Sequence, residues 1–195
     1  AYILVYVDDV LIINKHPQRD MELIKSDFTV KPSSIEEPKS YLGADVNKVY
    51  YPDGSFAWTL GSETYVKRAV KNLKERMKKD GFGFNKKLSD MSHSAPQPFS
   101  NVNYRPELDT SDICNDVQIT FFQNLIGILR WIVELGRIDI GYEVSVLSRY
   151  LAHARTGHLV QALHMFKYLE IHNKNELALD PAYHDVVDPQ FVEEK

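Results

Sequence analysis

Two neighbouring acidic residues, Asp8 and Asp9, lie between two unbroken apolar runs near the start of the chain, residues 3–7 and 10–13. Apolar runs without polar alternation are typical of strands buried on both faces, and the short link between them predicts a tight hairpin with both aspartates at its tip. Adjacent carboxylates at low dielectric repel, so they must bind a proton or share a cation. Oxygen ligands of this kind suit Mg²⁺. The pattern predicts a magnesium site, with an ordinary Asp-Asp surface turn as the alternative for the dipeptide alone.

The residues after this hairpin predict two further elements that could position a substrate. Residues 18–28 have the apolar spacing of a short amphipathic helix, and the Pro- and Ser-rich residues 31–39 predict a loop. Residues 41–46 and 56–60, separated by a Pro-Asp-Gly-Ser turn at 52–55, predict a second hairpin. Ser62 is placed to cap a helix that ends at Gly81, with one apolar face formed by Val66, Val70, Leu73 and Met77.

Positive charge is concentrated on that helix. The whole chain has a net charge of −4, which by itself argues weakly against nucleic-acid binding. Residues 64–87, however, carry nine basic and two acidic side chains, a local charge of +7. The basic side chains are Lys67, Arg68, Lys71, Lys74, Arg76, Lys78, Lys79, Lys86 and Lys87. Such a basic stripe is what a phosphate-binding element requires, although a solvated helix face is the alternative.

The second half of the chain predicts a helical unit. Residues 89–111 are rich in Ser, Pro and Asn, which predicts a linker with no core of its own. Beyond it, residues 117–135, 139–151 and 158–171 have the periodicity of three helices, the second capped by Asp139, that pack as a bundle. Residues 181–195 are polar and acidic without periodicity, which predicts a linker or a frayed tail.

Composition limits the classes of function. At 195 residues with 44% hydrophobic and 26% charged residues, the chain has an ordinary globular composition, and no apolar stretch is long enough for a membrane span. One cysteine, Cys114, excludes an internal disulfide and fits a reducing compartment, so we expect an intracellular location. His153, His158 and His164 lack zinc-site spacing, so we expect structural or surface roles for them. A chain that starts with Ala1, without Met or a signal peptide, is expected to be a piece of a longer polypeptide.

The string Tyr6-Val7-Asp8-Asp9, followed by an aliphatic strand, resembles the catalytic hairpin of reverse transcriptases, and most closely that of copia-type LTR retrotransposons. Further strings in the order and spacing of copia-type polyproteins support the resemblance over residues 1–172. They are Leu125-Ile126-Gly127, Arg137-Ile138-Asp139-Ile140, Val144-Ser145-Val146-Leu147-Ser148-Arg149-Tyr150, His158 and Lys167-Tyr168-Leu169. Ile138 departs from the family, which usually has Pro there.

The resemblance implies a two-metal nucleotidyl transfer with Mg²⁺, or Mn²⁺ in its place. It implies that Asp8 binds both metals and Asp9 is a looser ligand, while a third aspartate comes from an earlier strand. Tyr6 would then support the primer terminus, with core packing as its alternative role, and Val7 would touch the primer nucleotide. Leu42 and Gly43 would belong to a primer grip, with a plain hairpin in which Gly43 forms a bulge as the alternative. Lys31 or Lys39 could donate a proton to the leaving pyrophosphate.

The basic helix is similar to the thumb of these enzymes, so Tyr65, Lys67, Arg68, Lys71 and Lys74 are expected to contact the template-primer duplex. The family's Gln-x-x-Tyr entry to this helix is here Ser62-Glu63-Thr64-Tyr65, which keeps only the tyrosine.

The resulting expectation is an α+β fold of partial polymerase palm hairpins, a basic thumb helix and a C-terminal helical bundle. The divisions are 1–60 for the late palm, 61–88 for the thumb, 89–111 for the linker, 112–180 for the helical connection and 181–195 for a tail toward a ribonuclease H domain. The expected partners are a template-primer duplex, deoxynucleoside triphosphates and the rest of the Pol polyprotein, with no membrane. A non-catalytic nucleic-acid-binding module and a decayed or host-adopted element fragment are the alternatives.

Overall fold

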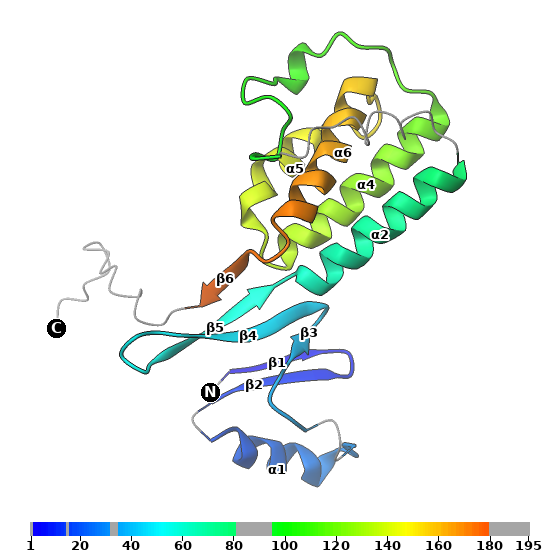
Figure 1. Cartoon of the computed structure of the whole chain (residues 1–195). Coiled ribbons are helices and arrows are strands. Elements are labelled where there is room, and N and C mark those ends of the chain that lie inside the picture. The colour runs from blue at the N-terminus through cyan, green and yellow to red at the C-terminus, as the bar shows by residue number, and fades with distance from the viewer. Residues whose placement is uncertain (1, 15, 32–34, 81–94, 180–195) are drawn as a thin grey trace, which may run out of the picture.

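The computed structural model describes residues 2–14, 16–31, 35–80 and 95–179. A helical bundle occupies one end, a four-stranded sheet lies in the middle, and a two-stranded hairpin with a short helix occupies the other end (Figure 1). The mixture of antiparallel hairpins and helices agrees with the α+β expectation. The assignment of these parts to the palm and thumb of a polymerase stays a prediction.

The first hairpin forms as predicted, but its tip differs. Strand β1 (Tyr2–Tyr6) pairs antiparallel with β2 (Asp9–Ile13), and Tyr6 lies opposite Asp9. The two turn residues are therefore Val7 and Asp8, not Asp8 and Asp9. Val7 has a φ of 55°, a strained conformation for a β-branched residue. Placing both aspartates in the turn was wrong because the strand pairing continues one residue further on the β2 side.

The prediction that these strands are buried on both faces is also wrong for this chain. Val5 is 66% exposed, and Ile3, Leu4, Val10 and Ile13 are exposed as well. Exposed apolar side chains lie on both faces of the two-stranded sheet, because successive side chains alternate along each strand. Helix α1 (Pro17–Asp27) contacts β2 but buries none of its own residues. Among the described residues, α1 therefore covers the hairpin only in part, and Leu11 and Ile12 of β2 are half-buried.

The central sheet is an antiparallel meander with an unexpected fourth strand. Strands β3 (Ser40–Tyr41), β4 (Ala44–Tyr50) and β5 (Phe56–Gly61) follow one another, and β6 (Glu176–Leu179) joins at the edge of β5. Leu42 and Gly43 form the two-residue turn between β3 and β4, with φ values of 50° and 88°. Two successive positive φ values are typical of a type I′ hairpin turn. Gly43 is thus a turn residue and not a bulge, and the predicted strand 41–46 is divided at this point.

Helix α2 (Glu63–Asp80) follows β5 directly and confirms the predicted apolar face. Val66, Val70, Leu73 and Met77 are all buried. The predicted cap is wrong, however, because the Ser62 hydroxyl is buried without a hydrogen-bond partner among the described residues. The carboxylate of Asp45, on β4, accepts a hydrogen bond from the Thr64 backbone N–H at 2.9 Å instead. The helix is therefore capped from the neighbouring strand.

The helices form one continuous core rather than a thumb and a separate bundle. Helices α4 (Asp116–Glu134), α5 (Gly141–Ser148) and α6 (Thr156–Ile171) pack with α2 into a single hydrophobic cluster. Asn115 and Gln118 form a capping box at the start of α4. The predicted second helix is shorter than expected, because residues 138–140 form the 3₁₀ helix η3 (Ile138–Ile140) and Asp139 does not cap α5.

Residues 95–111 differ from the predicted linker because they contribute to this core. Ala95, Phe99 and Pro106, the first residue of the 3₁₀ helix η2 (Pro106–Leu108), are buried. Three histidines bind backbone carbonyls of the segment through Nε2, with contacts His158 to Pro106 at 3.0 Å, His164 to Gln97 at 3.2 Å and His172 to Ala95 at 3.2 Å. The structural role expected for His158 and His164 is confirmed, and burial lowers the pKa of His164, which favours its neutral form.

Several predictions fall outside the described residues, namely the helix end at Gly81, Lys86, Lys87, residues 89–94 and the tail at 181–195. Within the described residues, no helix is both long and apolar enough to span a membrane.

The cap contributed by Asp45 can be tested against the cap that the sequence suggests. Replacing Asp45 by Ala should lower the free energy of unfolding by about 1 kcal/mol, because the Thr64 N–H loses its acceptor at the helix terminus. Ser62→Ala is the matched comparison, and it should be neutral or slightly stabilising because it removes a buried hydroxyl without a partner. Urea titration followed by circular dichroism measures both, and a larger loss for Ser62→Ala would contradict the assignment.

Candidate carboxylate hairpin and basic groove

Asp8 and Asp9 lie at the exposed end of the first hairpin. Asp8 is in the turn and Asp9 is the first residue of β2, and both side chains are exposed. The expected low-dielectric environment is therefore not present among the described residues. Tyr6 is the cross-strand partner of Asp9, so these two residues share a face of the hairpin. Tyr6 is 59% exposed, which excludes core packing as its role within the described residues.

The donor atoms at this turn fit a hard divalent cation. Two carboxylates can provide one or two oxygen ligands to Mg²⁺, with water and phosphate oxygens completing the coordination. No group of three or more His, Cys, Asp or Glu side chains suited to a metal occurs in the described parts of the chain. Asp8 and Asp9 could thus hold a metal only together with ligands from outside the described residues.

The turn of the second hairpin lies beside a tryptophan of the bundle. A Cβ added at Gly43 would be 4.0 Å from Nε1 of Trp131 on α4, and the Trp131 side chain is 43% exposed. Trp131 was not predicted, since its proximity to Leu42 and Gly43 depends on packing between distant elements. Lys39 pairs with Glu36 at 3.5 Å on the surface, and Lys31 borders residues 32–34, which lie outside the described residues.

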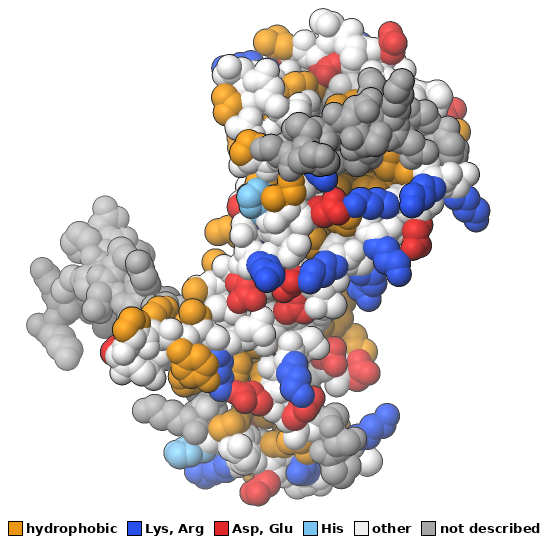
Figure 2. Space-filling view, viewed as in Figure 1, with side chains coloured by type: hydrophobic (Ala, Val, Ile, Leu, Met, Phe, Trp, Pro, Cys, Tyr) orange, Lys and Arg blue, Asp and Glu red, His pale blue; other side chains and the backbone are white. Residues whose placement is uncertain are grey.

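The basic side chains of α2 gather along one exposed edge of the bundle (Figure 2). Two of them already have acidic partners, since Lys67 pairs with Glu63 at 2.5 Å and Lys74 pairs with Glu170 of α6. Lys71 is exposed and makes no ion pair with a described residue. Exposed ion pairs contribute little to stability, so phosphate groups could compete for Lys67 and Lys74. Lys71 could therefore bind a phosphate without this competition.

A groove of about 280 Å³ runs between α2 and α4, and no lysine is among its lining residues. Its polar lining comes from Arg68, Asn72 and Arg76 of α2 and Asn124 of α4. The guanidinium of Arg68 lies over the Tyr65 ring at 5.4 Å, and that of Arg76 lies over Phe121 at 4.9 Å. Stacking on an aromatic ring orients a guanidinium while its edge still donates hydrogen bonds, as in phosphate recognition. Tyr65 and Arg68 were predicted for this role, and Arg76, although counted in the basic stripe, was not singled out.

Asn72, Phe121 and Asn124 were missed. Asn72 and Arg76 follow Arg68 at helical intervals of four residues, a signal that the sequence contained. The α4 side of the groove could not be paired with α2 from the sequence, because 40 or more residues separate the two faces.

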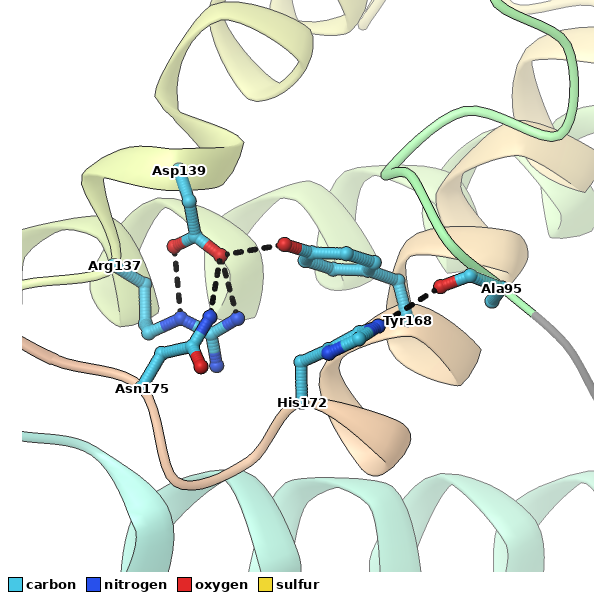
Figure 3. A network of polar contacts seen from close by, with 6 residues as sticks. All are labelled: Ala95, Arg137, Asp139, Tyr168, His172 and Asn175. Atoms are coloured by element: carbon cyan, nitrogen blue, oxygen red, sulfur yellow. Dashed lines mark hydrogen bonds and ion pairs between the residues drawn. The ribbon is translucent and has the colours of Figure 1, made fainter.

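A polar network surrounds the buried Arg137 side chain where the bundle meets the central sheet (Figure 3). Arg137, only 1% exposed, donates to the Asp139 carboxylate from Nε at 2.8 Å and from Nη2 at 2.7 Å. The same carboxylate accepts from the Tyr168 hydroxyl at 2.9 Å and from the Asn175 amide at 3.4 Å. Asn175 directly precedes β6, so the network joins η3, α6 and the entry to the edge strand of the sheet.

This network changes the ionisation of Asp139. Burial by itself raises the pKa of the carboxyl group, but hydrogen bonds from Arg137, the Arg137 charge and the Tyr168 hydroxyl outweigh burial and leave the pKa below its ordinary value of 3.8. The ionised carboxylate is therefore favoured in the folded protein, and it balances a guanidinium that water cannot reach.

Comparison with known proteins gives one informative similarity. The chain is 28% identical over 170 residues to the "Putative transposon Ty5-1 protein YCL074W" of Saccharomyces cerevisiae, which covers 86% of this chain and 48% of the yeast protein. The chain therefore spans about half the length of the curated relative that it matches. No family model and no solved structure matches the chain. The similarity relates the chain to a transposon protein and leaves its activity to be proposed.

The junction network predicts a specific acid sensitivity. Asp139→Asn should cost roughly 2–4 kcal/mol of unfolding free energy at neutral pH, because it leaves the buried Arg137 charge without its counterion. Because folding lowers the pKa of Asp139, its ionised carboxylate stabilises the folded protein above about pH 3.8, and this stabilisation is lost as the pH falls further.

The difference between wild type and Asp139→Asn should consequently shrink below pH 4 in denaturant titrations at several pH values. Asp112→Asn removes an exposed carboxylate near α4 and serves as the control, with little effect at any pH. A wild-type advantage that stays constant down to pH 2 would contradict the role of the ionised carboxylate.

Proposed function

We propose that this chain is part of the reverse transcriptase of an LTR retrotransposon of the copia type, and that it supplies the late palm, thumb and connection. The observation that carries the proposal is the position of Asp8 and Asp9 at the exposed end of a tight hairpin between apolar strands. The similarity to the yeast transposon protein supports a transposon origin independently of this geometry.

The proposed reaction joins a primer 3′-hydroxyl to the α-phosphorus of a deoxynucleoside triphosphate and releases pyrophosphate. Bound Mg²⁺ ions would supply charge stabilisation at the attacking and leaving oxygens. Asp8 and Asp9 would hold those ions, with Asp8 as the residue that binds both. The resemblance implies a third aspartate from an earlier strand, so we expect another carboxylate to complete the site in the working enzyme. The chain by itself should therefore incorporate no nucleotide.

The remaining surfaces support a role in holding a primer-template duplex. Tyr6 and Val7, both exposed, adjoin the carboxylates, and the Leu42–Gly43 turn is proposed to grip the primer end. Tyr65, Lys67, Arg68, Lys71 and Lys74 form the proposed contact with the phosphate backbone along α2. Contacts to phosphates position a duplex without reading its sequence, so the binding should depend steeply on salt.

A non-catalytic nucleic-acid-binding module is the second candidate. The observation that favours it is that α2 and its groove belong to a well-packed core, whereas the carboxylate hairpin is exposed on both faces. The two candidates share the α2 surface and differ only in the use of Asp8 and Asp9, which allows substitutions to separate them.

The catalytic proposal predicts the effect of Asp8→Asn in the polypeptide that carries this chain together with its remaining metal ligands. Primer extension with Mg²⁺ should fall at least about 100-fold, because the bridging carboxylate becomes a neutral amide. Asp53→Asn makes the same change at another exposed hairpin turn, where Asn before Gly54 is equally suitable, and should keep full activity. Extension that survives Asp8→Asn would refute the catalytic assignment and leave the binding module.

The binding surface predicts the effect of Lys71→Glu. Affinity of the chain for a primer-template duplex should decrease for all sequences, and the slope of log K against log salt should become shallower by about 1. Lys25→Glu places the same charge reversal on exposed residue 25 of α1 and should have a much smaller effect. Fluorescence anisotropy at several salt concentrations measures both, and equal effects of the two substitutions would exclude a specific α2 contact.

A further inference from the structure

A second cavity of about 280 Å³ lies on a different side of the bundle, between residues 97–107 and the start of α5. The proposed polymerase function makes no use of it. Its apolar lining comes from Phe99, Pro106 and Val146, which are all buried, and the Phe99 ring packs edge to face with Tyr104 at 5.4 Å. The cavity therefore has a rigid apolar base formed by two segments that are far apart in the sequence.

One carboxylate in this cavity lacks a counterion. Glu143 of α5 is half-buried in the lining and makes no ion pair or hydrogen bond with another described residue. Burial raises its pKa, with the nearby Asp139 charge adding to the effect. The other two charged residues of the lining, Arg105 and Glu107, pair with each other at 3.8 Å. The unbalanced charge that faces a ligand is therefore the negative charge of Glu143.

The mouth of the cavity is surrounded by exposed apolar side chains. Val102 and Tyr142, both in the lining, are 73% and 75% exposed. Leu108 follows Glu107 of the lining, and Ile138 lies one helical turn before Tyr142, and both are exposed too. Hydrophobic side chains are visible along the α5 edge of the bundle (Figure 2). Exposed apolar side chains that gather around a pocket are a feature of protein interaction sites.

We infer that this cavity docks a partner polypeptide through one arginine or lysine side chain flanked by apolar residues. The volume is below the usual range for small-molecule sites and suits a single long side chain. The aliphatic stem of the side chain would lie on Phe99 and Val146 while its charged end reaches Glu143, and Tyr142 would cover it from the rim. An arginine can form two parallel hydrogen bonds to the carboxylate and is the better ligand of the two.

The test uses the 195-residue chain and a blocked, fluorescein-labelled pentapeptide with a central arginine between two leucines. The control peptide replaces arginine by citrulline, which keeps the shape and removes the charge. The arginine peptide should bind at millimolar concentration or below and compete with its unlabelled form, and citrulline should weaken binding at least tenfold. Glu143→Gln should cause the same loss, as should Tyr142→Ala, whose exposed ring can be removed without affecting the core.

Glu75→Gln removes an exposed carboxylate from α2 and is the matched control, with binding unchanged. The inference is overturned if no peptide binds at millimolar concentration, or if the arginine and citrulline peptides bind equally well. It is also overturned if the chain self-associates in sedimentation analysis and Glu143→Gln abolishes that association, because the face would then join two copies. None of these outcomes depends on polymerase activity, so the failure of one proposal leaves the other intact.

Discussion

The buried ion pair between Arg137 and Asp139 is the contact on which the arrangement of sheet and bundle depends. A guanidinium that is 1% exposed requires a counterion, and Asp139 provides it with two short hydrogen bonds. The same carboxylate binds Tyr168 of α6 and Asn175 at the entry to β6, so its position is fixed by three elements. Nη1 of Arg137 is buried without a hydrogen-bond partner among the described residues, and an ion pair with a buried member often adds little net stability, so the value of this pair is geometric.

The neighbours of this pair support that view. Gly136 has a φ of 99°, and a Cβ there would lie 3.2 Å from the backbone oxygen of Leu60 on β5. The bundle and the sheet thus approach closely at the residue that precedes Arg137. On the opposite edge of β5, Asp45 of β4 caps α2. Two independent connections therefore fix the α2–α4 groove relative to the Leu42–Gly43 turn, and a ligand that touches both surfaces would meet a preformed site.

Local patterns predicted the helices well, because their causes lie within a few residues. The spacing of Val66, Val70, Leu73 and Met77 identified the buried face of α2, and all four residues are buried. The elements that were missed depend on contacts over long sequence distances. Strand β6 is four residues long and exists because it pairs with β5, more than 110 residues earlier. Residues 95–111 have the composition of a linker, yet histidines 52 to 77 residues further along bind their carbonyl groups.

The candidate site was predicted unevenly for the same reason. The sequence identified Asp8, Asp9 and the charge of α2, since composition and short strings carry those signals. It could not identify the α4 half of the groove, Trp131 beside Gly43, or the cap by Asp45. The sequence also predicted a buried environment for the carboxylates. An apolar run indicates that a strand is normally covered by another element, but it does not show whether that element lies among the described residues.

The two parts of the proposed site, the α2–α4 groove and the carboxylate hairpin, differ in how far the described residues bury them. The groove residues rest on a core that includes Val66, Leu125 and Phe166, each almost inaccessible to solvent, so their geometry is set by packing within the described residues. The carboxylate hairpin has only two strands, Val5 and Val7 are largely exposed, and an isolated two-stranded hairpin is marginally stable in water. An apolar layer against β1 and β2 would stabilise the hairpin and exclude water from around Asp8 and Asp9 at the same time. The electrostatic conditions for metal binding would then arise together with the burial of the strands, whereas phosphate binding by α2 requires no such layer.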